Sequence, residues 1–197
     1  MSDLTRRDVL QRLALAIAAA GTIDALDARE AHAAVQEAAA AAGGRYVPKA
    51  LSAHEFATLE RLTDLIVPAD DKPGALQAEV APWIDTLLNV NAGLKAKYAA
   101  GLAWLDAAIA ANGAKHFVSA TPAHHAALLD VIAYRKNRTA DNATGIDFFV
   151  LARRMTCDGF YTSTIGMRDV YMGNTPQATF VVPQAAIDYV LSRSPLK

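Results

Sequence analysis

The chain has 197 residues, with 19 Lys and Arg against 20 Asp and Glu, so its formal charge is −1 at pH 7. This length suits one domain with its own core, and the balanced charge argues against a nucleic-acid partner. Cys157 is the only cysteine, which excludes an intrachain disulfide. Stability must therefore come from packing, and we expect Cys157 to be a buried structural thiol.

The N-terminus has the pattern of an export signal. Arg6 and Arg7 precede a short apolar run at 13–21, which is typical of the twin-arginine route for proteins exported already folded. The run is about nine residues long, whereas a transmembrane helix needs about twenty. Residues 31–33, Ala-His-Ala, have the form of a signal-peptidase site, so we expect cleavage after Ala33. The predicted organisation is a signal peptide (1–33), an Ala/Gly-rich linker or frayed helix (34–45) and a helical domain (46–197).

The remaining chain has the apolar period of amphipathic helices. Ser52 and Glu55 form a capping box before the first helix, and Pro68 ends it. Thr121 precedes a first-turn proline, residues 144–147 resemble a second capping box, and glycines mark several helix ends. These signals predict an all-α, single-domain bundle of five to six helices with a long irregular C-terminal segment. The predicted spans are 52–66, 80–88, 94–112, 121–132, 144–159 and 183–192.

The segment from Phe160 to Thr179 has no helical period, and residues 180–182 are predicted to form one short strand. Aromatic, Met and Arg side chains are enriched at interface cores. A glycine-interrupted segment cannot bury all of its large side chains on one helical face, so we expect residues 160–182 to contact a partner. The alternative is that the segment packs across its own bundle. The predicted interface residues are Phe160, Tyr161, Ile165, Met167, Arg168, Tyr171, Met172 and Phe180.

The sequence predicts no catalytic, cofactor-binding or metal-binding residue in this chain. No Glu-x-x-His pair supports a di-iron site, and no Cys-x-x-Cys-His or Gly-x-Gly-x-x-Gly motif supports a haem or a dinucleotide. His124 and His125 are neighbours on a helix and point about 100° apart, so they cannot grip one metal from a single face. Asp70 and Asp71 are interpreted as solvated turn residues.

Several short segments, in a fixed order, are the most specific feature of the mature chain. They are LSAHEFATLE (51–60), LIVPADD (65–71), VAPWID (80–85), YAAGLAWLD (98–106), DFF (147–149) and DGFYTS (158–163). Their order, together with the twin arginines, resembles the small-subunit family of the gluconate 2-dehydrogenases, also called subunit 3 or the gamma subunit. The resemblance covers residues 46–174 besides the signal.

The resemblance implies a non-catalytic subunit of a periplasmic or membrane-associated sugar dehydrogenase. In such complexes a flavoprotein of the glucose–methanol–choline type holds FAD, and a cytochrome c subunit often accepts the electrons, so haem c or an iron–sulfur cluster is expected only elsewhere in the complex. The small subunit supplies the export signal and supports maturation of the flavoprotein. Partners in the family act on gluconate, glucose, fructose, sorbitol or glucosides; Gly159 to Ser163, with Gly166, favours the glucoside 3-dehydrogenase type.

Two other readings stay open. In the second reading the chain is an independent periplasmic helical binding domain, and in the third it is a small enzyme in its own right. A neighbouring gene for a flavoprotein without a signal of its own would favour the accessory subunit, and its absence would favour the binding domain. Sugar oxidation by the purified chain with an artificial electron acceptor would be required for the third reading, against which the missing cofactor motifs argue.

Overall fold

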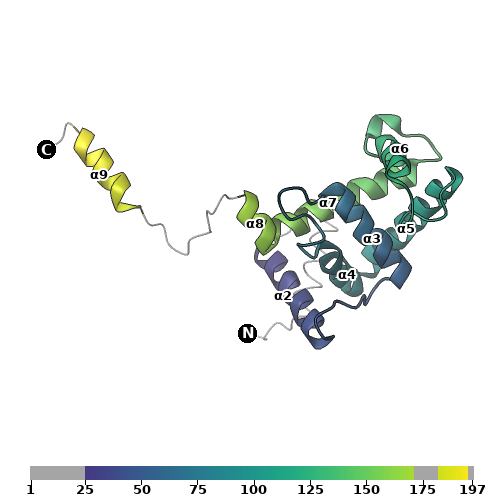
Figure 1. Cartoon of the computed structure of the whole chain (residues 1–197), viewed down its shortest axis with the longest axis horizontal. Coiled ribbons are helices and arrows are strands. Elements are labelled where there is room, and N and C mark those ends of the chain that lie inside the picture. The colour runs from purple at the N-terminus through teal and green to yellow at the C-terminus, as the bar shows by residue number, and fades with distance from the viewer. Residues whose placement is uncertain (1–24, 171–181, 195–197) are drawn as a thin grey trace.

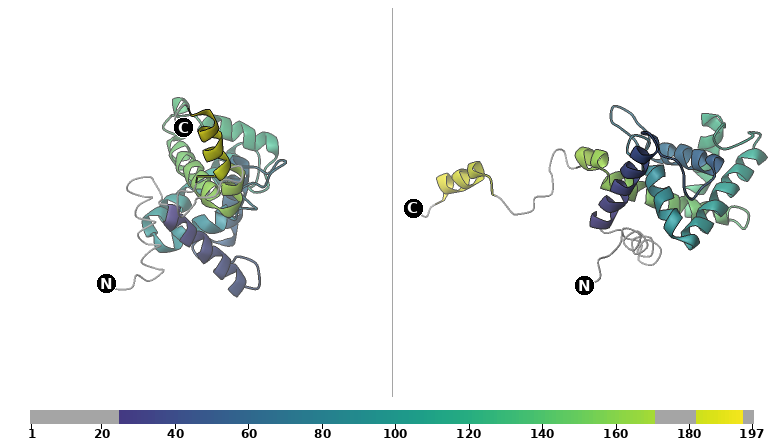
Figure 2. Two further views of the ribbon diagram at one scale, coloured as in Figure 1. Left: turned by 90° about the vertical axis from the view of Figure 1, so that its left-hand side faces the viewer. Right: turned by 90° about the horizontal axis from the view of Figure 1, so that it is seen from below.

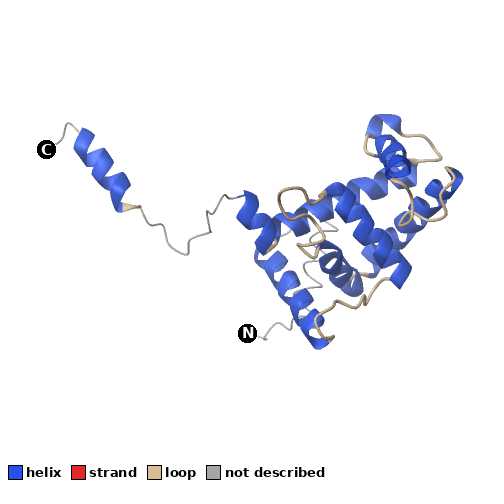
Figure 3. Cartoon of the chain, viewed as in Figure 1, coloured by secondary structure: helices blue, strands red, loops and turns tan. Residues whose placement is uncertain are grey.

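The structure is a computed structural model that describes residues 25–170 and 182–194. Over these ranges it consists of helices and connecting segments without a strand (Figure 3), which confirms the all-α prediction. None of the described helices combines the length and apolarity needed to cross a bilayer. The elements are α2 (Ala25–Ala41), α3 (Ala53–Ile66), α4 (Val80–Val90), α5 (Ala92–Ala111), α6 (Pro122–Ile132), the 3-10 turn η1 (Arg135–Asn137), α7 (Ala143–Thr162), α8 (Thr164–Val170) and α9 (Gln184–Arg193).

Helix α4 lies inside the bundle and is apolar around most of its circumference. Every residue from Val80 to Leu88 is buried, as expected for a helix with neighbours on all sides. Those neighbours are α2, α3, α5 and α7 (Figure 1). The fully buried Trp83 is the largest side chain of α4. The core is therefore organised around this helix.

The predicted capping signals of three helices are confirmed. The Ser52 Oγ accepts a hydrogen bond from the Glu55 N–H at 3.3 Å, and the Glu55 carboxylate accepts one from the Ser52 N–H at 2.8 Å. Gly113 follows α5 with φ of 91°, a left-handed conformation that glycine adopts without strain. Thr121 caps α6 by accepting from the His124 N–H at 3.3 Å. Local capping chemistry thus sets these helix ends.

The prediction that the fifth helix stops at Gly159 is wrong, because α7 continues to Thr162. A Cβ atom placed on Gly159 would lie 2.8 Å from a ring carbon of Trp83. The glycine therefore allows α7 to approach the Trp83 ring on α4 closely, and it does not terminate the helix. Its role depends on a residue far away in the sequence.

The capping box predicted at 144–147 is also wrong. Helix α7 begins at Ala143, and its N-cap Asn142 makes no side-chain capping hydrogen bond. The carboxylate of Asp147 instead accepts two hydrogen bonds from the Arg138 guanidinium, at 2.5 and 2.9 Å. The acidic side chain thus pairs across the η1–α7 connection and does not reach back to the helix start.

The segment predicted as a linker or frayed helix (34–45) is helical over residues 34–41, which belong to α2, and the expectation that it stays outside the core is wrong. This helix packs against α4 and α7. Its buried positions carry small side chains, and Val35 is 1% exposed. Alanine has a high helix propensity and lets helices approach closely, so an alanine-rich segment that resembles a linker contributes to the core. The buried residues of α2 are Ala28, Ala31, Val35 and Ala39.

The irregular segment predicted from Phe160 is helical as far as the structure describes it. The last residues of α7 are followed directly by α8. The short strand predicted at 180–182 falls mostly on residues outside the described ranges. The last predicted helix, at 183–192, is confirmed as α9, which begins after Pro183.

Candidate functional site

Asp85 is a carboxylate in the middle of α4 with no exposed surface. The Tyr46 hydroxyl donates to its Oδ2 at 2.8 Å. The backbone N–H groups of Lys49 and Leu51 donate to its two oxygens at 2.7 and 2.9 Å. Ala50 N–H adds longer contacts, the shorter at 3.2 Å. A buried charge is tolerated when its hydrogen bonds are satisfied in this way. Asp85 therefore holds the extended chain before α3 against the central helix.

Three helices meet at the ring of Trp83. The His32 ring on α2 stacks on it, with ring centroids 5.7 Å apart and an interplanar angle of 23°. The Nε2 atom of His32 lies 3.2 Å from the Thr162 Oγ1, at the end of α7. Gly159 of α7 lies against the same ring. Helix α2 therefore contacts Thr162 at the C-terminal end of α7, within the segment 160–182 that is predicted to bind a partner.

Burial lowers the pKa of His32 from 6.5 to about 4, while a hydrogen bond with the Gly159 backbone acts in the opposite direction. The folded-state pKa is thus below the unfolded one, so the unfolded chain binds more protons between these two values. The contribution of His32 to stability is complete above pH 6.5 and is lost as the pH falls toward 4.

We expect the substitution His32→Gln to reduce the loss of stability on acidification. Wild-type protein should lose up to about 3 kcal/mol of unfolding free energy through this histidine, and the variant should lack that component. Urea unfolding at a series of pH values measures the difference. His116→Gln, at an exposed position, is the matched control and should follow wild type when EDTA is present in both samples. An unchanged pH profile in His32→Gln would contradict the assignment.

The predicted interface residues divide into buried and exposed ones. Phe160 is 5% exposed and belongs to the hydrophobic core, so it supports its own bundle. Ile165 is partly buried against the same core, and Met167 is half-buried. Tyr161 is 48% exposed and Arg168 is exposed. The three remaining residues, Tyr171, Met172 and Phe180, lie outside the described ranges.

Ser163 sets the direction of α8 relative to α7. Its buried hydroxyl donates to the Phe160 carbonyl at 2.6 Å and accepts from the Gly166 N–H at 3.0 Å. A Cβ atom on Gly166 would lie 2.0 Å from the Phe160 carbonyl oxygen, so the turn needs glycine there. The junction thus presents Tyr161 and Arg168 from a fixed backbone.

Helix α9 lies apart from the bundle (Figure 1 and the right-hand view of Figure 2). It buries none of its residues. Ile187, Val190 and Leu191 are spaced at three and four residues, which places them on one face. Val190 and Leu191 are each 65% exposed. No part of the described bundle covers this apolar face.

His125 and Asp70 make local hydrogen bonds, whereas His124 and Cys157 are half-buried. The buried His125 lies with its Nε2 2.8 Å from the Phe117 carbonyl oxygen, and the adjacent His124 is half-buried. Asp70 is in a turn, where a hydrogen bond from the Lys72 N–H lowers its pKa. Cys157 is half-buried, and desolvation raises the pKa of its thiol. A raised thiol pKa disfavours the reactive thiolate.

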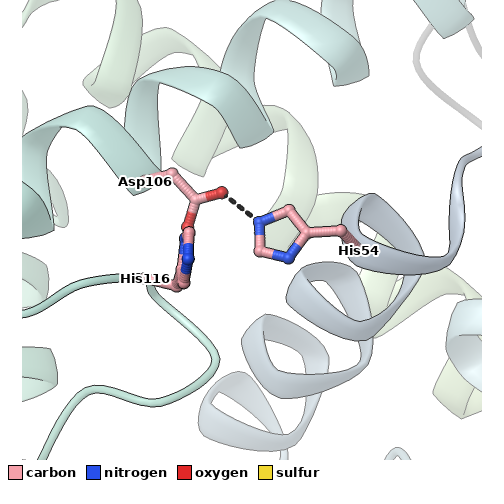
Figure 4. Close-up of side chains that lie close together, drawn as sticks. All are labelled: His54, Asp106 and His116. Atoms are coloured by element: carbon pink, nitrogen blue, oxygen red, sulfur yellow. Dashed lines mark hydrogen bonds and ion pairs between the residues drawn. The ribbon is translucent and has the colours of Figure 1, made fainter.

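Two features were missed by sequence reasoning because separate segments form them. His54, Asp106 and His116 come together on the surface from α3, α5 and the loop after α5 (Figure 4). A groove of about 500 Å³ lies between the 44–48 segment, α3 and the start of α4. Its lining includes Tyr46, Phe56 and Glu60, and desolvation raises the pKa of Glu60. No local sequence motif indicates either feature.

Comparison with known proteins yields one match. The family model for gluconate 2-dehydrogenase subunit 3 matches residues 53–178, which is most of the chain and includes α3 to α8. No curated protein and no solved structure matches the chain significantly. The matched range contains Asp85, Trp83 and the predicted interface residues up to Met172.

Proposed function

This chain belongs to the gluconate 2-dehydrogenase subunit 3 family, accessory subunits of a dehydrogenase complex, and from that premise we propose that it binds and stabilises a sugar-oxidising flavoprotein. The partner is a glucose–methanol–choline type subunit that holds FAD. A cytochrome c subunit that accepts its electrons fits the same arrangement. The glucoside 3-dehydrogenase type is the preferred substrate class. The catalytic chemistry belongs to the partner.

The exposed apolar face of α9 is the observation that carries this proposal. Helix α9 has 10 residues and buries none of them, whereas isolated helices shorter than about 12–15 residues are marginal in water. A partner that covers the face would supply the missing packing. An amphipathic helix in a hydrophobic groove is a common mode of recognition. Tyr161 and Arg168 at the α7–α8 junction are a second, separate group of exposed side chains that a partner could contact.

The export role is part of the proposal. The twin arginines would direct this folded chain, together with the bound flavoprotein, to the periplasm, where an uncleaved signal would hold the complex at the inner membrane. Cleavage after Ala33 would cut within α2 and remove His32 from the Trp83 ring. Proteolysis favours exposed, unpacked segments. We therefore propose that α2 is retained whole and that any cleavage occurs before it.

Charge placed on the apolar face of α9 should weaken binding of the flavoprotein. We expect Val190→Asp combined with Leu191→Asp to reduce co-purification of the flavoprotein by at least about tenfold, because burying a charge in an apolar interface is costly. Affinity capture of the co-expressed complex, with the bound FAD measured by absorbance, gives the result. The triple substitution of Tyr161, Arg168 and Tyr171 should act in the same direction.

Ser192→Asp on the opposite side of α9 is the matched control and should leave the complex intact. Thermal unfolding of the small subunit alone checks that the fold is unchanged, since both substituted positions are exposed. A complex that survives both the α9 and the junction variants would overturn this interface. If the flavoprotein never co-purifies with wild type, the groove beside α3 makes the independent binding domain the better function.

A further inference from the structure

The surface cluster of His54, Asp106 and His116 combines two imidazoles and one carboxylate. The Nε2 atom of His54 lies 2.5 Å from Asp106 Oδ2, and the two histidine rings have centroids 5.0 Å apart in an edge-on arrangement. One ligand atom from each residue lies within 4.8 Å of the others. Figure 4 shows a nitrogen of the His54 ring directed at the Asp106 carboxylate, with the His116 ring seen edge-on. Three residues from separate elements thus converge on one point.

The backbone around the cluster holds the ligands in place. Asp106 Oδ1 accepts from the Phe117 N–H at 2.8 Å, which ties the loop carrying His116 to α5. Phe117 is fully buried, and its ring packs against the ring of His125. His54 is in the first turn of α3, just after the Ser52 cap. The loop is therefore anchored at Phe117, the residue that follows the exposed His116.

The donor set matches the chemistry of zinc and similar ions. Imidazole nitrogen and carboxylate oxygen bind Zn²⁺ and other first-row transition metals, whereas Mg²⁺ and Ca²⁺ prefer oxygen alone. Ligand atoms on a tetrahedral ion with bonds of about 2.0–2.1 Å lie about 3.3 Å apart. The His54–Asp106 pair is closer than this, so small rotations would admit an ion. The His54 side chain is 49% exposed and has room to rotate.

We propose that His54, Asp106 and His116 bind one divalent transition metal ion such as Zn²⁺. The three residues supply two neutral nitrogens and one negative oxygen, and a fourth position faces solvent, where water or a ligand from outside the cluster binds. This proposal departs from the expectation from the sequence that the chain holds no metal. It does not depend on the flavoprotein partner.

Calorimetric titration of the EDTA-treated full-length chain with Zn²⁺ tests the site. Wild type should bind one Zn²⁺ per chain and unfold at a higher temperature with the ion present, because a ligand that binds the folded state stabilises it. His54→Ala and His116→Ala should each weaken binding by at least about tenfold. Co²⁺ should give a visible absorption band in wild type that both variants lack, and Mg²⁺ should not compete.

Two further variants separate ligation from folding. Asp106→Asn keeps an acceptor for the Phe117 N–H but removes the negative ligand, so it should weaken Zn²⁺ binding while the metal-free melting temperature changes little. His124→Ala alters a half-buried histidine outside the cluster and should bind Zn²⁺ as wild type does. Undiminished Zn²⁺ binding in the His54→Ala, His116→Ala double variant would overturn the proposal, as would wild type that binds no Zn²⁺.

Discussion

The substitution Asp85→Ala is expected to lower the free energy of unfolding by about 3–5 kcal/mol, which is a large share of the stability of a domain this size. The carboxylate is fully buried and accepts from the Tyr46 hydroxyl and from the backbone before α3. Alanine would leave these buried donors without an acceptor, and each unsatisfied donor costs about 1–3 kcal/mol. The extended chain before α3 would then lose its hydrogen bonds to α4.

Chemical denaturation of the purified chain measures this effect. Tyr46→Phe removes only the hydroxyl donor and should cost about 0.5–1.5 kcal/mol. Asp147→Ala is the matched control, because this aspartate pairs with Arg138 on the surface and should change stability little. If Asp85→Ala unfolds at the same denaturant concentration as wild type, the buried network does not organise the fold.

Replacing Arg6 and Arg7 with lysine is expected to abolish export of this chain and of its flavoprotein partner. FAD-dependent sugar oxidation should disappear from the periplasmic and membrane fractions, and the flavoprotein should accumulate in the cytoplasm. The physical reason is that the folded complex would have one twin-arginine signal, which lies on this subunit. Activity assays and immunoblots of fractions from cells that express both genes give the result.

Arg12→Lys conserves charge outside the pair and should leave export intact. The mass of the exported chain provides a second readout, since a chain that retains α2 begins no later than Ala25. A start at Ala34 would show instead that α2 is dispensable in the mature protein. An active flavoprotein in the periplasm despite the lysine substitutions would show that the signal serves this chain alone, and would favour the independent binding domain.

Two of the contradicted predictions, the helix stop at Gly159 and the linker at 34–41, share one cause. Gly159 was interpreted as a helix stop and residues 34–41 as a linker, because glycine and alanine runs often mark such places. In the structure, the first is a close contact with Trp83 and the second is a buried face of α2. Glycine and alanine have the same local conformational preferences whether they end a helix, form a linker or pack against a neighbouring helix. Only the neighbouring helix decides which role applies.

The candidate sites likewise include residues that the sequence indicates and residues that only the structure brings together. Tyr161 and Arg168 could be proposed from composition and are exposed, whereas Phe160 has the same composition signal and is buried in the core. The His54–Asp106–His116 cluster could not be found by motif, because its residues come from two helices and a loop. A spacing rule detects only ligands that share one element.

The amino-acid sequence by itself determined the helical class, the caps at Ser52 and Thr121, the stop at Gly113 and the family, because these depend on local periodicity, capping hydrogen bonds and short ordered segments. The tertiary structure decided the burial of α2, the Asp85 network and the convergence of His54, Asp106 and His116. These depend on which segments meet in space, and no local preference encodes such contacts. Local sequence signals thus indicate most of the helices, and the packing of these helices determines which side chains meet.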